Sequence, residues 1–148
     1  MRAIVQRVSR ASVTVEGKIT GEIKAGLMVL LGIKDTDDDA VIEWMCNKLV
    51  NLRIFPDEEG KQNLSVKEVG GGILLVSNFT LYGDVKKGFR PSFGHAAKPE
   101  ISEPIYEKMI DALKSRSIPL ATGIFGAMMD VELINDGPVT ILIEKEAG

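Results

Sequence analysis

A four-residue Asn-Asp-Gly-Pro segment, residues 135–138, limits how the C-terminal part of this chain can fold. It separates two strand-like runs, residues 131–134 and 139–143, and two such runs across a short polar insert usually form a hairpin. The returning strand of a hairpin donates backbone N–H groups, however, and Pro138 has none to donate. Gly137 carries no side chain and precedes a residue of fixed φ. The segment is interpreted either as a simple turn or as a rigid surface whose bare carbonyls contact a small ligand.

The bulk properties indicate one globular domain over residues 1–148, because a chain of this length can bury a large core. No run approaches the roughly 20 apolar residues of a membrane span, and the first residues lack a signal-peptide pattern. We therefore expect a cytoplasmic protein without a membrane partner. Cys46 is the only cysteine, which excludes an internal disulfide and a cysteine-rich metal site. The formal charge of −3 argues against a broad nucleic-acid-binding surface but leaves room for a local one.

Strand-like runs lie at both ends of the chain, and two amphipathic helices lie between them. Apolar residues recur at helical spacing over residues 38–50 and 103–115, with Pro104 expected in the first turn of the second helix. Strands at both ends with two separated helices predict an α+β fold and not a regular βαβ repeat. Alternating or continuous apolar runs predict strands over residues 3–8, 12–16, 19–23, 27–33, 52–55 and 73–76 and from 128 to the end.

A polar segment, Ser77-Asn78-Phe79-Thr80-Leu81, follows the buried strand at residues 73–76. Hydroxyls, an amide and exposed N–H groups at a strand end are suited to a polar site. A serine or threonine nucleophile needs an adjacent base, and His95 is the only histidine. If the strand continued regularly, Ser77 and Thr80 would lie on opposite faces, so they can act together only if the chain bends. The single histidine and the alternating positions of Ser77 and Thr80 therefore disfavour a Ser-His-Asp triad.

No residue pattern indicates a metal or another cofactor. The acidic run at residues 37–39 is explained as a helix start, and no His-x-x-x-His or acidic loop pattern accompanies it. What remains is a site that works through shape, backbone donors and the substrate's own groups. We therefore expect no cofactor.

A basic loop contrasts with the acidic balance of the whole chain. Lys86, Lys87 and Arg90 lie close to Phe89 and Phe93. Such a cluster can hold the phosphates of a nucleic acid while an aromatic ring stacks on a base, or it can simply be solvated.

Taken together, the motifs resemble the D-aminoacyl-tRNA deacylases (D-tyrosyl-tRNA deacylases), which remove D-amino acids from tRNA. Any one fragment is weak evidence, but their order and the chain length make the resemblance specific. The matching segments are Gln6-Arg7-Val8, residues 11–15, Ser77-Asn78-Phe79-Thr80-Leu81, residues 90–93, Thr122-Gly123 with Phe125 and Met129, and residues 135–140.

The resemblance implies a single α+β domain with two main helices and a mostly antiparallel or mixed, curved, barrel-like sheet in layered β-β-α order. It also implies a homodimer with two sites at the subunit interface. Gly137-Pro138 would be a cis peptide that reaches into the partner's site and captures the α-amino group of the substrate. L-amino acids would be excluded by a steric clash, whereas glycine would pass. In the family, Arg7 holds this orientation.

The family motif Ser-Gln-Phe-Thr corresponds to Ser77-Asn78-Phe79-Thr80, with Asn78 in place of glutamine. Asparagine is one methylene shorter, so a hydrogen bond toward Arg7 would be rearranged. The resemblance implies that the 2′-hydroxyl of the terminal ribose helps to activate water, while N–H groups near Phe79 and Thr80 stabilise the oxyanion. An older view makes Thr80 the nucleophile. Phe125 and Met129 would line a pocket for the terminal adenine, or would simply be core residues.

The leading hypothesis is therefore an esterase that acts on the aminoacylated 3′ end of tRNA, including mischarged glycyl-tRNA. A related editing enzyme with a trans Gly-Pro would instead admit small L-amino acids. A non-catalytic RNA-binding module is the alternative from another class, for which Lys86, Lys87 and Arg90 would be sufficient. A structural dimer whose Gly-Pro only makes a turn is a third possibility.

Overall fold

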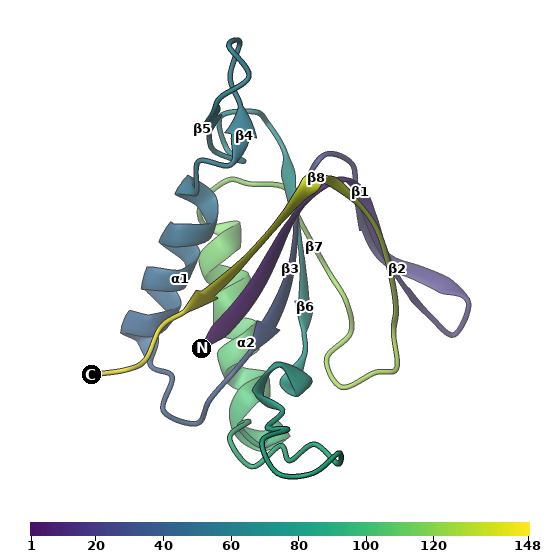
Figure 1. The fold of residues 1–148 in the computed structure, drawn as a ribbon, viewed down its shortest axis with the longest axis vertical. Helices are drawn as coiled ribbons and strands as arrows, with labels where there is room; N and C mark the ends of the chain where they lie inside the picture. The colour runs from purple at the N-terminus through teal and green to yellow at the C-terminus, as the bar shows by residue number, and fades with distance from the viewer.

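The strands near the two ends of the chain lie side by side in one mixed sheet (Figure 1). In the computed structural model, which describes residues 1–148, the strand order is β2-β1-β3-β6-β7, and β8 also pairs with β1. β1 pairs antiparallel with β2, β3 and β8, whereas β3 with β6 and β6 with β7 pair in parallel. The bounds are Arg2–Val15 for β1, Lys18–Ile23 for β2, Gly26–Gly32 for β3, Gly72–Ser77 for β6, Leu120–Thr122 for β7 and Asp130–Glu144 for β8.

The sheet curves until its two ends nearly meet. Gly21 of β2 lies so close to the backbone of Thr122 of β7 that a Cβ atom at Gly21 would collide with it. The result is a nearly closed, barrel-like sheet, as the resemblance implies.

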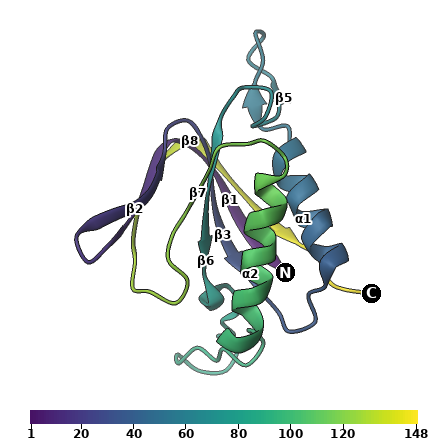
Figure 2. The ribbon, with the colours of Figure 1, turned by 180° about the vertical axis from the view of Figure 1, so that it is seen from behind.

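Two helices, α1 (Asp39–Asn51) and α2 (Pro99–Lys114), pack side by side against one face of the sheet (Figure 2). A small hairpin of β4 (Phe55–Pro56) and β5 (Gln62–Leu64) stands apart, and a 3₁₀ helix, η1 (Phe79–Tyr82), follows β6. Neither α-helix is long and apolar enough to span a membrane.

Both faces of the central strands β3 and β6 are buried, which explains their continuous apolar runs. Alternate side chains, such as Leu31 and Leu75, pack toward the helices in one cluster of 24 buried residues. Their neighbours, such as Met28 and Leu74, point into the barrel in a second cluster of 6. The end of β6 is therefore held rigidly from both sides.

Helix α1 begins within one residue of its predicted start, whereas α2 begins earlier than predicted. The side chain of Asp38 accepts a hydrogen bond from the N–H of Val41 and so caps α1, one residue from the predicted start. The second helix begins at Pro99 instead of residue 103, because Pro99 supplies the favourable proline in the first turn. Pro104 consequently lies inside α2 and not in its first turn, on an exposed position where water can reach the carbonyl that loses its partner.

Most predicted strands are present with different boundaries, but β5 and β7 form in segments for which no strand was predicted. The runs 3–8 and 12–16 join into one strand, β1, with register shifts in its pairing. Of the expected strand 52–55, only Phe55 is in a strand. The two runs that flank residues 135–138 do not pair with each other as a hairpin, because both belong to β8 and pair with β1.

Residues 136–139 instead form a bulge in β8, called the bulge below. The register passes from Gln6↔Thr140 directly to Val8↔Asn135, so these four residues lie opposite Arg7 alone. A proline without an N–H cannot take part in a regular ladder, and a bulge removes it from the pairing while the strand continues.

Candidate active site

The chain bends sharply where β6 ends at Ser77. The N–H of Asn78 donates to the carbonyl of Leu31 at 2.8 Å, which continues the pairing with β3 by one residue. The side-chain oxygen of Asn78 accepts from the N–H of Thr80 at 3.2 Å, so Asn78 caps η1. The Thr80 hydroxyl donates to the same oxygen. The sequence allows Ser77 and Thr80 to face one site only if the chain bends, and the structure has that bend.

A cavity of about 770 Å³ opens beside this segment, and its lining is mainly apolar. It gathers residues from β6, η1, α2 and the segment before β8. Six residues named from the sequence line it: Ser77, Asn78, Phe79, Thr80, Phe125 and Met129.

Aromatic rings form the wall of this cavity. Phe79 and Phe93 meet edge to face with their centroids 5.2 Å apart. Phe125 packs against Tyr106 at 5.7 Å, and the Tyr106 hydroxyl donates to the carbonyl of Leu75 at 3.0 Å. Burial raises the pKa of Tyr106 to about 12, so this hydroxyl stays protonated and keeps its bond to β6. Phe125 is thereby held by the core behind it.

Large apolar side chains are exposed to solvent at the mouth of the cavity. The Phe79 side chain is 58% exposed and Met128 is 93% exposed. Large apolar groups that remain in solvent around a cavity mark a binding site for a ligand or another chain. Phe93, Met128, Lys98 and Ser102 also line the cavity and are not among the residues predicted for the site.

The bulge lies apart from this cavity and is exposed on the outside of the chain. The peptide bond between Gly137 and Pro138 is cis. Asn135 closes the bulge: its oxygen accepts from the N–H of Val139 at 2.8 Å. Its amide nitrogen lies 3.1 Å from Gln6 Oε1, the carbonyl of Val139 and the hydroxyl of Thr140. The backbone of Gly137 and Pro138 is therefore fixed while nothing of the same chain covers it.

Arg7 supports the bulge from β1. Its Nε donates to the carbonyl of Asp136 at 2.9 Å, and its Nη1 donates to the carbonyl of Ile54 at 2.6 Å. Only 9% of Arg7 is exposed. Arg7 makes no hydrogen bond to Asn78, so the expected contact between these two side chains is absent.

The family model for D-Tyr-tRNA(Tyr) deacylase matches residues 4–144. A D-aminoacyl-tRNA deacylase of Koribacter versatilis is 55% identical over 146 residues, which cover 99% of this chain and 98% of that protein. The chain belongs to the D-Tyr-tRNA(Tyr) deacylase family.

Two solved structures share the fold of this chain. A structure described as a c-Myc DNA unwinding element binding protein superposes with a TM-score of 0.93 at 44% identity, covering 99% of this chain and 100% of that one. A probable eukaryotic D-amino acid tRNA deacylase superposes with a TM-score of 0.82 at 17% identity, covering 96% of this chain and 97% of that one, and supports the fold alone.

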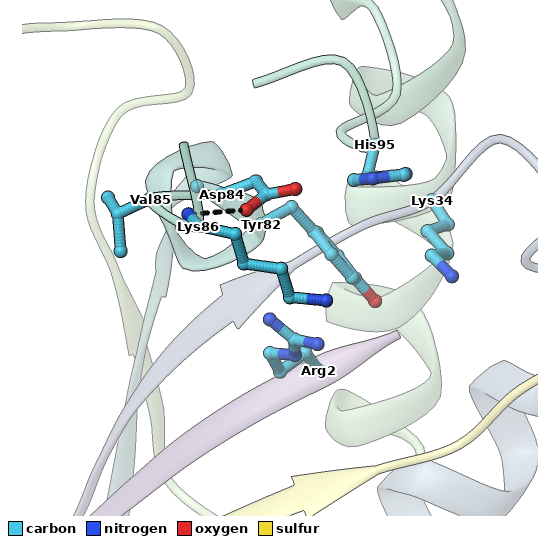
Figure 3. Close-up of a pocket in the computed structure, with 8 residues that line it drawn as sticks. Arg2, Lys34, Tyr82, Asp84, Val85, Lys86 and His95 are labelled. Carbon is cyan, nitrogen blue, oxygen red and sulfur yellow. Dashed lines mark hydrogen bonds between the residues drawn. The ribbon is translucent and has the colours of Figure 1, made fainter. Parts of the chain in front are cut away.

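In this member of the deacylase family, no imidazole accompanies Thr80 in the large cavity. His95 lines a second, smaller cavity together with Lys86 (Figure 3). Lys87 and Arg90 are exposed in the loop and line neither cavity. The residues named from the sequence thus occupy three places: the large cavity, the bulge with Arg7, and the basic loop. No group of three or more His, Cys, Asp or Glu side chains is arranged to hold a metal ion.

Proposed function

We propose that this chain is a D-aminoacyl-tRNA deacylase, which hydrolyses the ester between a D-amino acid and the 3′ end of tRNA. The observation that carries the proposal is the convergence of Ser77, Asn78, Phe79 and Thr80 on one apolar cavity in a chain of this family. Water attacks the ester carbonyl carbon, the ester C–O bond breaks, and the tRNA hydroxyl leaves with a proton. We further propose that residues 1–148 act as one domain in the cytoplasm.

The backbone of η1 is proposed to stabilise the charge that develops in this reaction. The first N–H groups of a helix lack intrahelical partners. Asn78 caps the N–H of Thr80 but not that of Phe79, which leaves Phe79 to donate to the oxyanion. The terminal adenine would stack in the same cavity, against the rings of Phe79 and Phe125 and beside Met129.

Activation of water is assigned to the substrate and not to a side chain. The Thr80 hydroxyl donates to Asn78, and His95 belongs to another cavity, so Thr80 has no base to remove its proton. The 2′-hydroxyl of the terminal ribose is the remaining group that can orient and activate water. Thr80 then acts by holding Asn78 and the start of η1, and not as a nucleophile.

Chiral selection is proposed to come from the bulge of a second copy of the chain. Gly137 and Pro138 are exposed and do not line the cavity of their own chain, which supports a homodimer in which they enter the partner's cavity. The carbonyls of the segment would accept hydrogen bonds from the α-amino group of the substrate. This position leaves no room for an L side chain, whereas a D side chain points away and glycine has none, so mischarged glycyl-tRNA is also a substrate.

The test is hydrolysis of matched D-tyrosyl-tRNA and L-tyrosyl-tRNA by the purified protein in the presence of EDTA. Rapid loss of the D-ester with the L-ester spared is the expected result. Cleavage of both esters would overturn the selection by Gly137 and Pro138. Survival of both would favour the second candidate function, a non-catalytic nucleic-acid-binding module, which the exposed cations Lys86, Lys87 and Arg90 support. In that case Thr80→Val would leave RNA affinity unchanged.

A further inference from the structure

A second cavity has a volume of about 390 Å³ (Figure 3). It is lined by Tyr82 at the end of η1, whereas Phe79 and Thr80 at the start of η1 line the apolar cavity. The polar side chains that line the second cavity are three cations, one carboxylate, one phenol and one imidazole: Arg2, Lys34, Lys86, Asp84, Tyr82 and His95. The chain as a whole has a formal charge of −3, whereas cations outnumber carboxylates in this lining, although Glu144 and Glu146 beside it pair with Arg2 and Lys34. We call this cavity the basic pocket.

Lys86 is the cation in the basic pocket whose charge is not compensated. Its backbone N–H donates to Asp84 at 2.9 Å, but its ammonium group makes no hydrogen bond or ion pair. Figure 3 shows this side chain directed toward Arg2 and the ring of Tyr82. Arg2 and Lys34 are ion-paired with Glu144 and Glu146, so Lys86 alone among these cations lacks a carboxylate partner, and a bound anion would supply one.

Arg2 is fixed in place before any ligand arrives. Its Nη1 donates to the carbonyl of Leu81 at 2.7 Å, and its guanidinium lies 4.6 Å from the centroid of the Tyr82 ring. Its Nε lies 2.8 Å from a carboxylate oxygen of Glu144, yet the N–H is not aligned with that oxygen and makes no hydrogen bond. Holding a guanidinium in this way lowers the entropy that is lost when it binds a ligand.

Tyr82 adds a neutral donor to the cations. The residue is buried, and burial raises the pKa of its hydroxyl above the ordinary value, so the proton is retained. The hydroxyl has no hydrogen-bond partner in the chain, and Figure 3 shows it at the same end of the pocket as the Lys86 ammonium group. A hydroxyl donor beside ammonium and guanidinium groups matches the oxygen atoms of a phosphate.

The basic pocket and the apolar cavity are lined by neighbouring residues of the same two chain segments. Phe79 and Thr80 at the start of η1 line the apolar cavity, whereas Tyr82 at its end lines the basic pocket. At about 2 Å of rise per residue, these two ends are roughly 6 Å apart. The next segment does the same, with Phe93 in one cavity and His95 in the other. The two cavities are therefore close enough for one nucleic-acid strand to reach both.

We infer that the basic pocket binds a phosphate group through Lys86, Arg2 and the Tyr82 hydroxyl, and that this group is a backbone phosphate of tRNA near its 3′ end. The identification of tRNA as its source rests on the proposed function, whereas the phosphate site itself rests on the pocket. Lys86 is thus separated in role from Lys87 and Arg90, which only add charge around the strand. Asp84 orients the Lys86 backbone by accepting a hydrogen bond from its N–H.

The first test is titration of the ¹⁵N-labelled protein with inorganic phosphate, followed by NMR. Saturable shifts confined to the amides of Gly83, Lys86 and His95 are expected. Lys86→Glu should weaken phosphate binding at least fivefold, and Tyr82→Phe, which removes only the hydroxyl, about twofold to threefold. The matched control is Lys67→Glu, because Lys67 is an exposed lysine without a partner in the loop between β5 and β6, at the opposite end of the molecule. Absence of saturable shifts at these amides would overturn the phosphate site.

The second test uses a short RNA hairpin with a single-stranded CCA end that carries no amino acid. Lys86→Glu should weaken its binding and reduce the slope of log K against log salt concentration by about 0.7 to 0.9, whereas Lys67→Glu should not. If inorganic phosphate binds but RNA affinity is indifferent to Lys86→Glu, the pocket serves a free phosphate compound and the tRNA assignment is wrong. Neither test measures deacylation, so an inactive protein with an intact phosphate site would count against the proposed function alone.

Discussion

The end of β6 and the bulge in β8 are both interruptions of a strand that an asparagine side chain holds in place, but the two asparagines are used differently. Asn135 is saturated: its oxygen accepts from Val139, and its two N–H groups are shared among three acceptors. Asn78 uses only its oxygen, which accepts twice from Thr80, and its amide nitrogen makes no hydrogen bond.

The hydrogen bonds of Asn135 are all made within the chain, whereas Asn78 keeps a donor that a ligand can use. The bulge needs no further partner to keep its shape, which suits a rigid element that rejects what does not fit. The end of β6 keeps an unused donor that borders the large cavity. A substrate bound there can accept a hydrogen bond from the Asn78 amide. The bound and free states would then differ by this hydrogen bond.

The largest effect is expected for Asn135→Ala. This change leaves the half-buried N–H of Val139 without an acceptor, so the free energy of unfolding should fall by about 2–3 kcal/mol in urea denaturation. Deacylation of D-tyrosyl-tRNA should fall about 100-fold, because displacement of a substrate-contacting element by 1 Å has an effect of that order. Asn51→Ala is the control, since Asn51 bonds only to its own exposed helix face. Unchanged stability would show that the bulge is not held by Asn135.

Gly137→Ala should have the next largest effect. Gly137 has a φ of 153°, and a Cβ atom there would lie 2.6 Å from the N atom of Val139 and 2.8 Å from its Cγ2. We expect a loss of about 1–2 kcal/mol in stability and a fall in kcat for the D-ester, measured on the same preparations. Gly60→Ala is the matched control: Gly60 also has a positive φ of 79°, but its Cβ would meet nothing within 4 Å. Equal losses of activity in Gly137→Ala and Gly60→Ala would show that the bulge has no specific role in deacylation.

How far the sequence predicts these two segments depends on the range of the interactions involved. Helix α1 and the buried strands β3 and β6 follow from local periodicity, since their side chains need only a core to pack against. The bulge does not follow, because its register is set by pairing with β1, more than a hundred residues away. Local turn chemistry therefore indicates a turn or a rigid surface at residues 135–138, but it does not show that the strand continues through them.

The site shows the same limit. The residues of the polar segment were found by their composition and by the family motif, but their common cavity depends on the bend that Asn78 makes. Met128 was missed, and Phe93 was assigned to the basic loop and not to this cavity, because only the tertiary arrangement places them beside it. The separation of His95 from Thr80 is also a property of the fold, since it depends on which side of η1 each residue lies.

A smaller effect, divided between stability and activity, is expected at Asn78. Asn78→Ala removes the cap of η1 and should cost about 1 kcal/mol in thermal or urea denaturation. Asn78→Asp keeps the oxygen that accepts from Thr80 and should retain the stability, while it replaces the free amide donor by a negative charge. Deacylation should therefore fall about tenfold in both variants. If Asn78→Asp keeps full activity, the free donor has no part in the reaction and the contrast with Asn135 is only structural.

Asp136→Asn should have the smallest effect, because Arg7 contacts this residue mainly through its backbone. Arg7 Nε donates to the carbonyl of Asp136 at 2.9 Å, whereas the carboxylate lies 3.6 Å away on a side chain that is 59% exposed. Exposed ion pairs of this kind contribute little, so the free energy of unfolding should change by less than about 0.5 kcal/mol. In the same experiment, raising the salt concentration should not change the difference in the free energy of unfolding between the variant and the wild type. A loss above about 1 kcal/mol would mean that the Asp136 carboxylate itself holds the bulge, and that the bulge depends on charge as well as on the amide of Asn135.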